Sequence, residues 1–68
     1  MDFQIKGEYI ELIKLLKLVN VAESGAQAKM MVDDGIVTVN GDRELRRRKK
    51  LRPGDRVEVE GQTVQITA

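Results

Sequence analysis

The spacing of apolar residues predicts two helices in the first half of the chain. In residues 8–19, apolar positions that recur at intervals of three and four residues form one stripe of a helix. The stripe consists of Leu12, Leu15, Leu16 and Val19. Ile10 and Leu18 point away from this stripe, so they either cover a strand or belong to an apolar contact surface.

The second helix has sequence signals at both ends. Ser24 and Gln27 have the spacing of a capping box, in which the serine hydroxyl accepts from the Gln27 N–H and the glutamine side chain reaches back. Gly35 stands where a left-handed residue ends a helix. The apolar face consists of Ala28, Met31 and Val32. Only residues 20–23 join the two helices, so we expect them to pack as a short helical hairpin.

Shorter segments that alternate between polar and apolar residues predict strands. These segments are residues 2–6, 36–39, 57–59 and 64–66. Turns are predicted at Asn40-Gly41, Arg52–Asp55 and Gly61-Gln62. Leu45 and Leu51 are the only apolar anchors of the segment between the first two turns. The pattern predicts an α+β fold, with the helical hairpin packed on a small, mainly antiparallel sheet.

Composition restricts the chemistry that the chain can perform. Its 68 residues predict a single domain, residues 1–68. Without cysteine and histidine, the chain lacks disulfides, thiolate zinc sites and the usual general base near neutral pH. No nucleophile–base pair, phosphate-cradling glycine loop or metal-ligand spacing is present, so we expect neither an enzyme nor a cofactor. No signal peptide or membrane span is recognisable, which predicts a cytoplasmic protein without membrane contact.

The charge of the chain is concentrated in one segment. Residues 43–52 carry seven positive charges and one negative charge, whereas the other 58 residues carry five positive and ten negative charges. The formal net charge of +1 therefore conceals a basic segment of +6 beside an acidic remainder of −5. A basic patch of this density points to a polyanionic partner.

The order of these elements, together with residues 24–41, resembles a known RNA-binding domain. The stretch Ser-Gly-Ala-Gln-Ala-Lys-Met-Met-Val-Asp-Asp-Gly-Ile-Val-Thr-Val-Asn-Gly, with a later Pro53-Gly54-Asp55, is similar to the domain first seen in small-subunit ribosomal protein S-four. Residues 15–18, residues 23–29 and the basic run resemble short stand-alone bacterial members, of the YaaA and YbcJ type. The resemblance spans residues 8–60 and implies the αL type of RNA-binding motif.

The resemblance also implies which residues contact RNA. Family members often carry arginine after the residue that caps the second helix, and at the start of the first helix. Here these places hold Gly25 and Glu8–Ile10, so the RNA contact must rest more on Lys29 and the basic run. The candidate RNA-binding residues are Lys29, Arg43, Arg46, Arg47, Arg48, Lys49, Lys50 and Arg52.

We therefore expect the chain to bind structured RNA, ribosomal or transfer RNA, on the ribosome or its assembly intermediates. Phe3 and Tyr9 are the only aromatic residues, which favours recognition of RNA shape and phosphates over base stacking. One alternative is a protein-interaction module that docks on an acidic partner through Ile10, Leu18 and Met30. Another is non-specific nucleic-acid binding, which predicts equal affinity for duplex DNA and structured RNA.

Overall fold

The computed structural model describes residues 1–68 and contains two helices and seven short strands. The strands are β1 (Asp2–Gln4), β2 (Ile10–Glu11), β3 (Val37–Val39), β4 (Asp42–Arg43), β5 (Lys50–Leu51), β6 (Arg56–Val59) and β7 (Gln62–Thr67). Five of them form one sheet in the order β1-β7-β6-β3-β4, in which β1 runs parallel to β7 and the other neighbours are antiparallel. β2 and β5 form a separate antiparallel pair.

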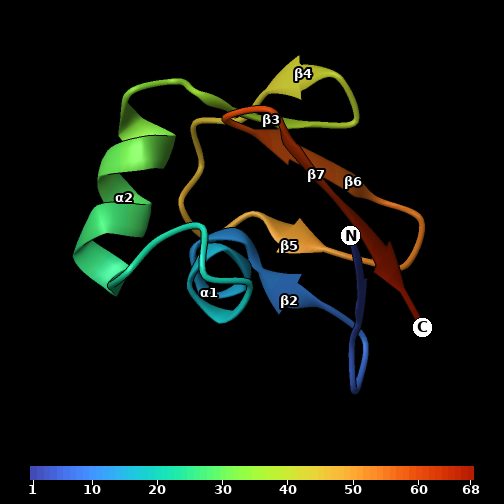
Figure 1. Ribbon diagram of the computed structural model, residues 1–68. Coiled ribbons are helices and arrows are strands. Elements are labelled where there is room, and N and C mark those ends of the chain that lie inside the picture. The colour runs from blue at the N-terminus through green and yellow to red at the C-terminus, as the bar shows by residue number, and fades with distance from the viewer.

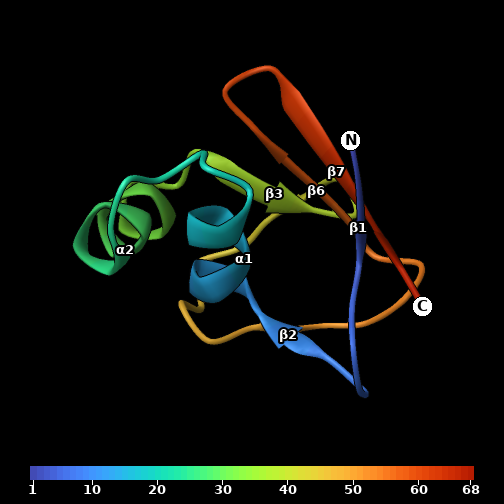
Figure 2. The same ribbon diagram turned by 60° about the horizontal axis from the view of Figure 1, so that its bottom comes forward.

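Both helices cover the same face of the five-stranded sheet (Figure 1 and Figure 2). α1 (Leu12–Leu18) and α2 (Gly25–Asp33) pack against each other as a helical hairpin. The predicted α+β fold, with two helices on a mainly antiparallel sheet, is therefore confirmed. The parallel pairing of β1 makes the sheet mixed, and it places the first strand at the edge opposite β4.

α2 begins and ends as the sequence predicts. The Oγ of Ser24 accepts from the N–H of Gln27 at 3.1 Å. The Gln27 side chain reaches back to accept from the N–H of Glu23 at 2.6 Å, one residue before the expected partner. After the helix, Gly35 adopts a φ of 74°, the left-handed conformation that glycine takes at low cost.

α1 is shorter than the apolar spacing predicts. The helix predicted over residues 8–19 begins only at Leu12, because Ile10 and Glu11 are extended and pair with β5. The pattern of residues 8–19 contains no sign of this partner, which lies far along the chain. Helical spacing alone therefore assigns to α1 residues that tertiary pairing draws into a strand.

The three apolar residues predicted as exposed contacts differ in their surroundings. Leu18 and Met30 are exposed, as predicted. Ile10 is buried, because the strand pairing turns its side chain into the core opposite Leu51. The prediction of Ile10 as an exposed contact is therefore wrong.

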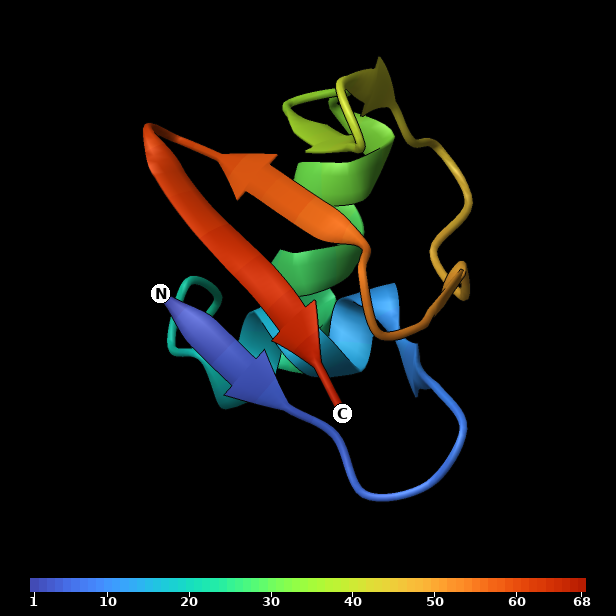
Figure 3. The ribbon, with the colours of Figure 1, turned by 90° about the vertical axis from the view of Figure 1, so that its right-hand side faces the viewer.

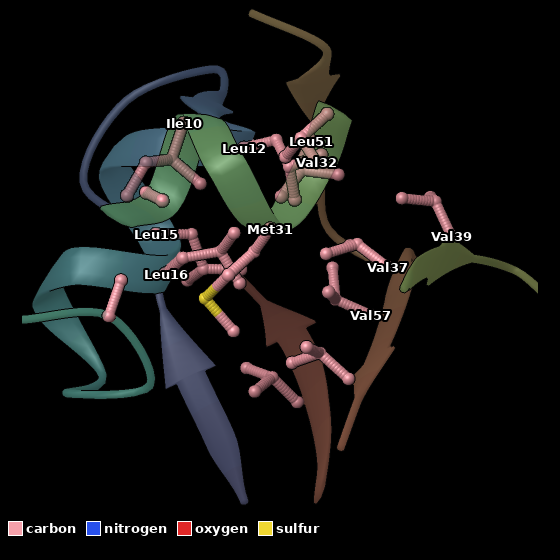
Figure 4. Close-up of a cluster of buried hydrophobic side chains, with 14 of the residues drawn as sticks. Ile10, Leu12, Leu15, Leu16, Met31, Val32, Val37, Val39, Leu51 and Val57 are labelled. Atoms are coloured by element: carbon pink, nitrogen blue, oxygen red, sulfur yellow. The ribbon is translucent and has the colours of Figure 1, made fainter. Parts of the chain in front are cut away.

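The core is one cluster of 16 buried aliphatic residues between the helices and the sheet. Figure 4 shows Leu15 and Leu16 of α1 gathered with Met31 of α2, across from Val37 of β3 and Val57 of β6. No aromatic side chain belongs to the buried cluster, in agreement with the composition. The core thus depends on many small aliphatic contacts, each of modest size.

Only one of the two predicted anchors of the basic segment reaches the core. Leu51 is fully buried, whereas Leu45 is 58% exposed and anchors nothing. Glu44 is buried instead. Its carboxylate accepts hydrogen bonds from Arg46, and the guanidinium balances its negative charge. Adjacent residues of an extended segment point to opposite sides, so Leu45 is directed outward.

The hairpin turns are close to their predicted places. Asn40 and Gly41 join β3 to β4 with φ values of 54° and 89°. The turn from β6 to β7 lies at Glu60-Gly61, one residue earlier than predicted, and Val59 pairs with Gln62. A two-residue turn of this kind needs positive φ at both positions, and glycine suits the second.

Asn40 also fastens a neighbouring turn. Its side-chain Nδ2 donates to Asp55 at 3.0 Å, and its Oδ1 accepts from the N–H of Arg56 at 2.9 Å. The other Asp55 oxygen accepts from the N–H of Arg52 at 2.8 Å. These contacts tie the β3–β4 turn to the Pro-Gly-Asp turn that precedes β6.

Asn40→Ala should lower the free energy of unfolding by about 2 kcal/mol, because it removes two hydrogen bonds and strains a positive φ. Asn40→Gly loses the same hydrogen bonds but relieves the backbone, so it should cost about half as much. Urea unfolding of both variants measures the difference. Equal destabilisation would show that the backbone conformation contributes nothing.

Candidate nucleic-acid interface

The residues between β4 and β5, residues 44–49, form a loop that we call the basic loop. Its backbone carbonyls accept from the first turn of α1. The N–H of Leu12 donates to Lys49 O at 2.9 Å, and the N–H of Ile13 donates to Arg47 O at 3.2 Å. Glu11 at the N-cap makes no side-chain cap, so the basic loop supplies the acceptors that the helix start requires.

The basic loop lies at the edge of the fold and leaves its three arginines, Arg46–Arg48, exposed. In Figure 3 the loop follows the rim of the molecule between β4 and the start of α1, away from β1 and β7. Its two ends are fixed by β4, which pairs with β3, and by Leu51, which is fully buried. A dense basic segment is thus held in one path without burying its charges.

Five side chains of the basic segment surround one open hollow of about 410 Å³. They are Arg46, Arg48, Lys49, Lys50 and Arg52, and we call this site the cationic hollow. No apolar residue lines it. Like charges in such proximity repel one another, and an anion with several oxygens would relieve that repulsion.

Arg46 has a carboxylate partner within the fold. Its Nε donates to Glu44 at 2.9 Å, and a second guanidinium nitrogen donates to the other carboxylate oxygen at 3.1 Å. The backbone N–H of Arg46 also donates to Glu44 at 3.0 Å. These hydrogen bonds lower the pKa of Glu44, despite the burial of its carboxyl group. Arg46 stays largely exposed, so it lines the cationic hollow and pairs with Glu44 at the same time.

Arg47 is turned to a different side of the basic loop. Its guanidinium makes two hydrogen bonds to Asp33 at the end of α2, at 3.0 Å and 2.6 Å. The pKa of Asp33 is lowered by this contact, chiefly through the Arg47 hydrogen bonds. Arg47 does not line the cationic hollow. The structure thus uses this side chain to connect the basic loop with α2.

The two remaining candidates, Arg43 and Lys29, lie outside the cationic hollow. Arg43 is exposed on β4, and its side chain lies against Gly35, where an added Cβ would come within 3.2 Å of it. Lys29 is exposed on α2. Neither lines the cationic hollow, so the structure gathers five of the eight predicted residues around it.

Three further residues shape the site and escaped the sequence prediction. Glu44 looks like an isolated acid in a basic run, Asp33 like a helix end, and Tyr9 like part of the first helix. The Nζ of Lys50 lies 4.9 Å from the centre of the Tyr9 ring, a cation–π contact. Only the pairing of β2 with β5 brings these two together.

No group of three or more carboxylate side chains is gathered in a way that could hold a metal ion. Neither α1 nor α2 has the length and apolar composition of a membrane-spanning helix.

Glu44→Gln should destabilise the fold by about 1 kcal/mol at neutral pH, a small value because its partner Arg46 is exposed and screened by water. Arg46 lowers the pKa of Glu44, so this stabilisation is present above the ordinary carboxyl pKa and is lost as the pH falls through the lowered pKa. Urea unfolding between about pH 7 and pH 3 should show the two proteins converge in acid.

The matched control is Glu60→Gln, which changes an exposed glutamate that has no ion pair. Its free energy of unfolding should stay near that of the wild type. A difference between Glu44→Gln and wild type that persists unchanged in acid would contradict the assignment.

The chain matches known sequences over most of its length. Residues 3–67 match the family model of the S4 domain. "Putative RNA-binding protein YbcJ" of Escherichia coli K12 is 44% identical over 63 residues, which cover 93% of this chain and 90% of that protein. "Probable ribosome maturation protein RlbA" of Bacillus subtilis 168 is 44% identical over 57 residues, which cover 84% of this chain and 80% of that protein.

Solved structures give the same grouping. The solution structure of YbcJ from E. coli, which reveals an αL motif involved in RNA binding, is 43% identical with a TM-score of 0.76, covering 98% of this chain and 86% of that one. The 30S ribosomal protein S4e from Thermoplasma acidophilum shares the fold at 17% identity, with a TM-score of 0.70, over 85% of this chain and 31% of that one. The family match and the identity to YbcJ show that this chain belongs to the S4 domain family, as a YbcJ-like member.

Proposed function

We propose that residues 1–68 act as one RNA-binding unit that holds the phosphates of a structured RNA in the cationic hollow. The main support for this proposal is that all five side chains around the hollow are cationic and none is apolar. Arginine offers two-pronged donors and lysine a point charge, and both suit phosphate oxygens. The exposed rim position of the basic loop gives a large, rigid partner access to them (Figure 3).

The cations divide into two roles in this proposal. Arg48, Lys49, Lys50 and Arg52 have no ion-pair partner in the fold and are the principal phosphate contacts. Arg46 joins them through its exposed guanidinium, although it shares its charge with Glu44. Lys29 and Arg43 extend the cationic surface at its margin, and Arg47 fixes the basic loop.

The names of two relatives support this function and narrow the partner. YbcJ is named as an RNA-binding protein and RlbA as a ribosome maturation protein. We infer that the RNA is ribosomal, either in the ribosome or in an assembly intermediate in the cytoplasm, with transfer RNA as the next candidate. The function is recognition without chemistry on the bound RNA.

A protein partner with an acidic surface would use the same cations, but one observation favours RNA. The cationic hollow has no apolar side chain, whereas the centres of protein–protein interfaces are usually rich in apolar and aromatic residues. The preference for RNA over duplex DNA should come from shape. Phosphates are spaced differently in the two, so a surface that fits the phosphates of a folded RNA should bind duplex DNA less tightly.

A titration against a labelled, structured ribosomal RNA fragment should show a log–log salt slope of roughly −3.5 to −4.5, from five phosphate contacts. Arg48→Gln combined with Arg52→Gln removes two cations of the hollow and should make the slope shallower by about 1.4 to 1.8. The slope follows from fluorescence anisotropy at several salt concentrations, with duplex DNA as competitor.

The control combines Lys17→Gln with Arg56→Gln, which removes two exposed charges outside the cationic hollow. It should leave the slope near that of the wild type. Failure of the folded wild-type protein to bind any of a broad set of structured RNAs at low salt would refute the function, and equal affinity for duplex DNA would make it non-specific.

Asp33→Asn combined with Arg47→Gln removes one ion pair at constant net charge and should leave the salt slope unchanged. Arg48→Gln combined with Asp34→Asn has the same net charge but removes a cation without an ion pair. The salt slope of this variant should therefore become shallower by about 0.7 to 0.9. The same titration compares them, and thermal unfolding checks that both are folded. A loss as large in the first variant as in the second would place Arg47 among the phosphate contacts.

A further inference from the structure

Tyr9 lines a second, apolar hollow and contacts one lysine of the cationic hollow. Its ring is 42% exposed, and Lys50, which lines the cationic hollow, places its ammonium over the ring. Tyr9 itself lines the apolar hollow, whereas Lys50 does not. Tyr9 thus contacts a cation of the cationic hollow and also lines the apolar hollow, with part of its ring exposed to solvent.

The apolar hollow has a volume of about 350 Å³ and is built from β1, β2, the loop that joins them and α1. Five of its eight lining residues are hydrophobic: Phe3, Ile5, Tyr9, Ile10 and Leu18. The fold buries Ile5 and Ile10, so the floor of this hollow belongs to the core. The remaining lining residues are polar: Gln4, Lys6 and Lys14.

We propose that this hollow receives one unpaired nucleobase of the bound RNA, stacked on Tyr9, while its phosphate lies with Lys50. The inference rests on the proposed RNA-binding function and adds to it a subsite for a single extruded nucleotide. A base has two apolar faces and a polar edge, which suit the Tyr9 ring and the Gln4 amide respectively.

Charge favours a nucleotide over an apolar protein segment in this hollow. Lys6 and Lys14 both line it and are exposed, and the ammonium of Lys50 lies 4.9 Å from the centre of the Tyr9 ring. An apolar hollow with cations around it is complementary to a base carried on a phosphate backbone. The low aromatic content of the chain excludes a platform for several bases, but a single ring beside a phosphate site suffices for one.

The experiment compares three RNA hairpins that share one stem: fully paired, with a one-nucleotide bulge, and with the same bulge lacking its base. The protein has one tyrosine and no tryptophan, so its intrinsic fluorescence reports on Tyr9 alone. The bulged hairpin should bind at least about fivefold more tightly than the other two, as base–aromatic stacking allows, and it alone should quench the tyrosine emission strongly.

Two variants locate the effect. Tyr9→Leu keeps an apolar side chain but removes the ring, so it should lose the preference for the bulge while keeping salt-dependent binding of the paired hairpin. Tyr9→Phe keeps the ring and should keep the preference. Equal binding of the three hairpins by wild type, or a preference that survives Tyr9→Leu, overturns the subsite and leaves phosphate binding intact. Absence of binding to all three hairpins at low salt overturns the proposed function together with the subsite.

Discussion

The first turn of α1 leaves backbone N–H groups without partners inside the helix, and the carbonyls of the basic loop accept two of them. This exchange links the most highly charged segment of the chain to its most buried helix. The carbonyls of Arg47 and Lys49 can take this role only while their side chains point elsewhere, since the backbone faces the helix. The same contact that satisfies α1 therefore presents the cations outward.

The distribution of charge around the basic loop follows from this geometry. Two of its arginines meet carboxylates: Arg46 holds Glu44 within the loop, and Arg47 holds Asp33 of α2. In both contacts a carboxylate balances the positive charge of an arginine, and the ion pair holds the shape of the loop. Four cations without an ion pair, Arg48, Lys49, Lys50 and Arg52, surround one hollow together with Arg46. Arg46 and Arg47 thus hold the loop in place, and the remaining cations are the ones that we propose bind phosphate.

Local chemistry made much of the fold predictable from sequence. The cap of α2 and the Asn40-Gly41 turn were predicted correctly because each depends on residues that are neighbours in the chain. The start of α1 was predicted too early, because Ile10 pairs with Leu51 of β5, and the residues around Ile10 give no sign of this distant partner. The outward turn of Leu45 and the inward turn of Glu44 were missed for a related reason, since burial of an acid depends on a bond that the pattern does not encode. The candidate site was recognisable as a charge cluster, but its division into paired and free cations required the structure.

The parallel pairing of β1 with β7 has a consequence for the life of the chain in the cell. The amino group of Met1 donates to Thr63 O, a partner 62 residues away, and β1 has no other neighbour in the sheet. During synthesis β1 is made before β7 and cannot pair until β7 follows. Val64 and Ile66 of β7 are also core residues, so the core cannot close before then. The native sheet is therefore completed only after translation of this segment has ended, and until then the nascent chain exposes apolar residues that the finished protein buries.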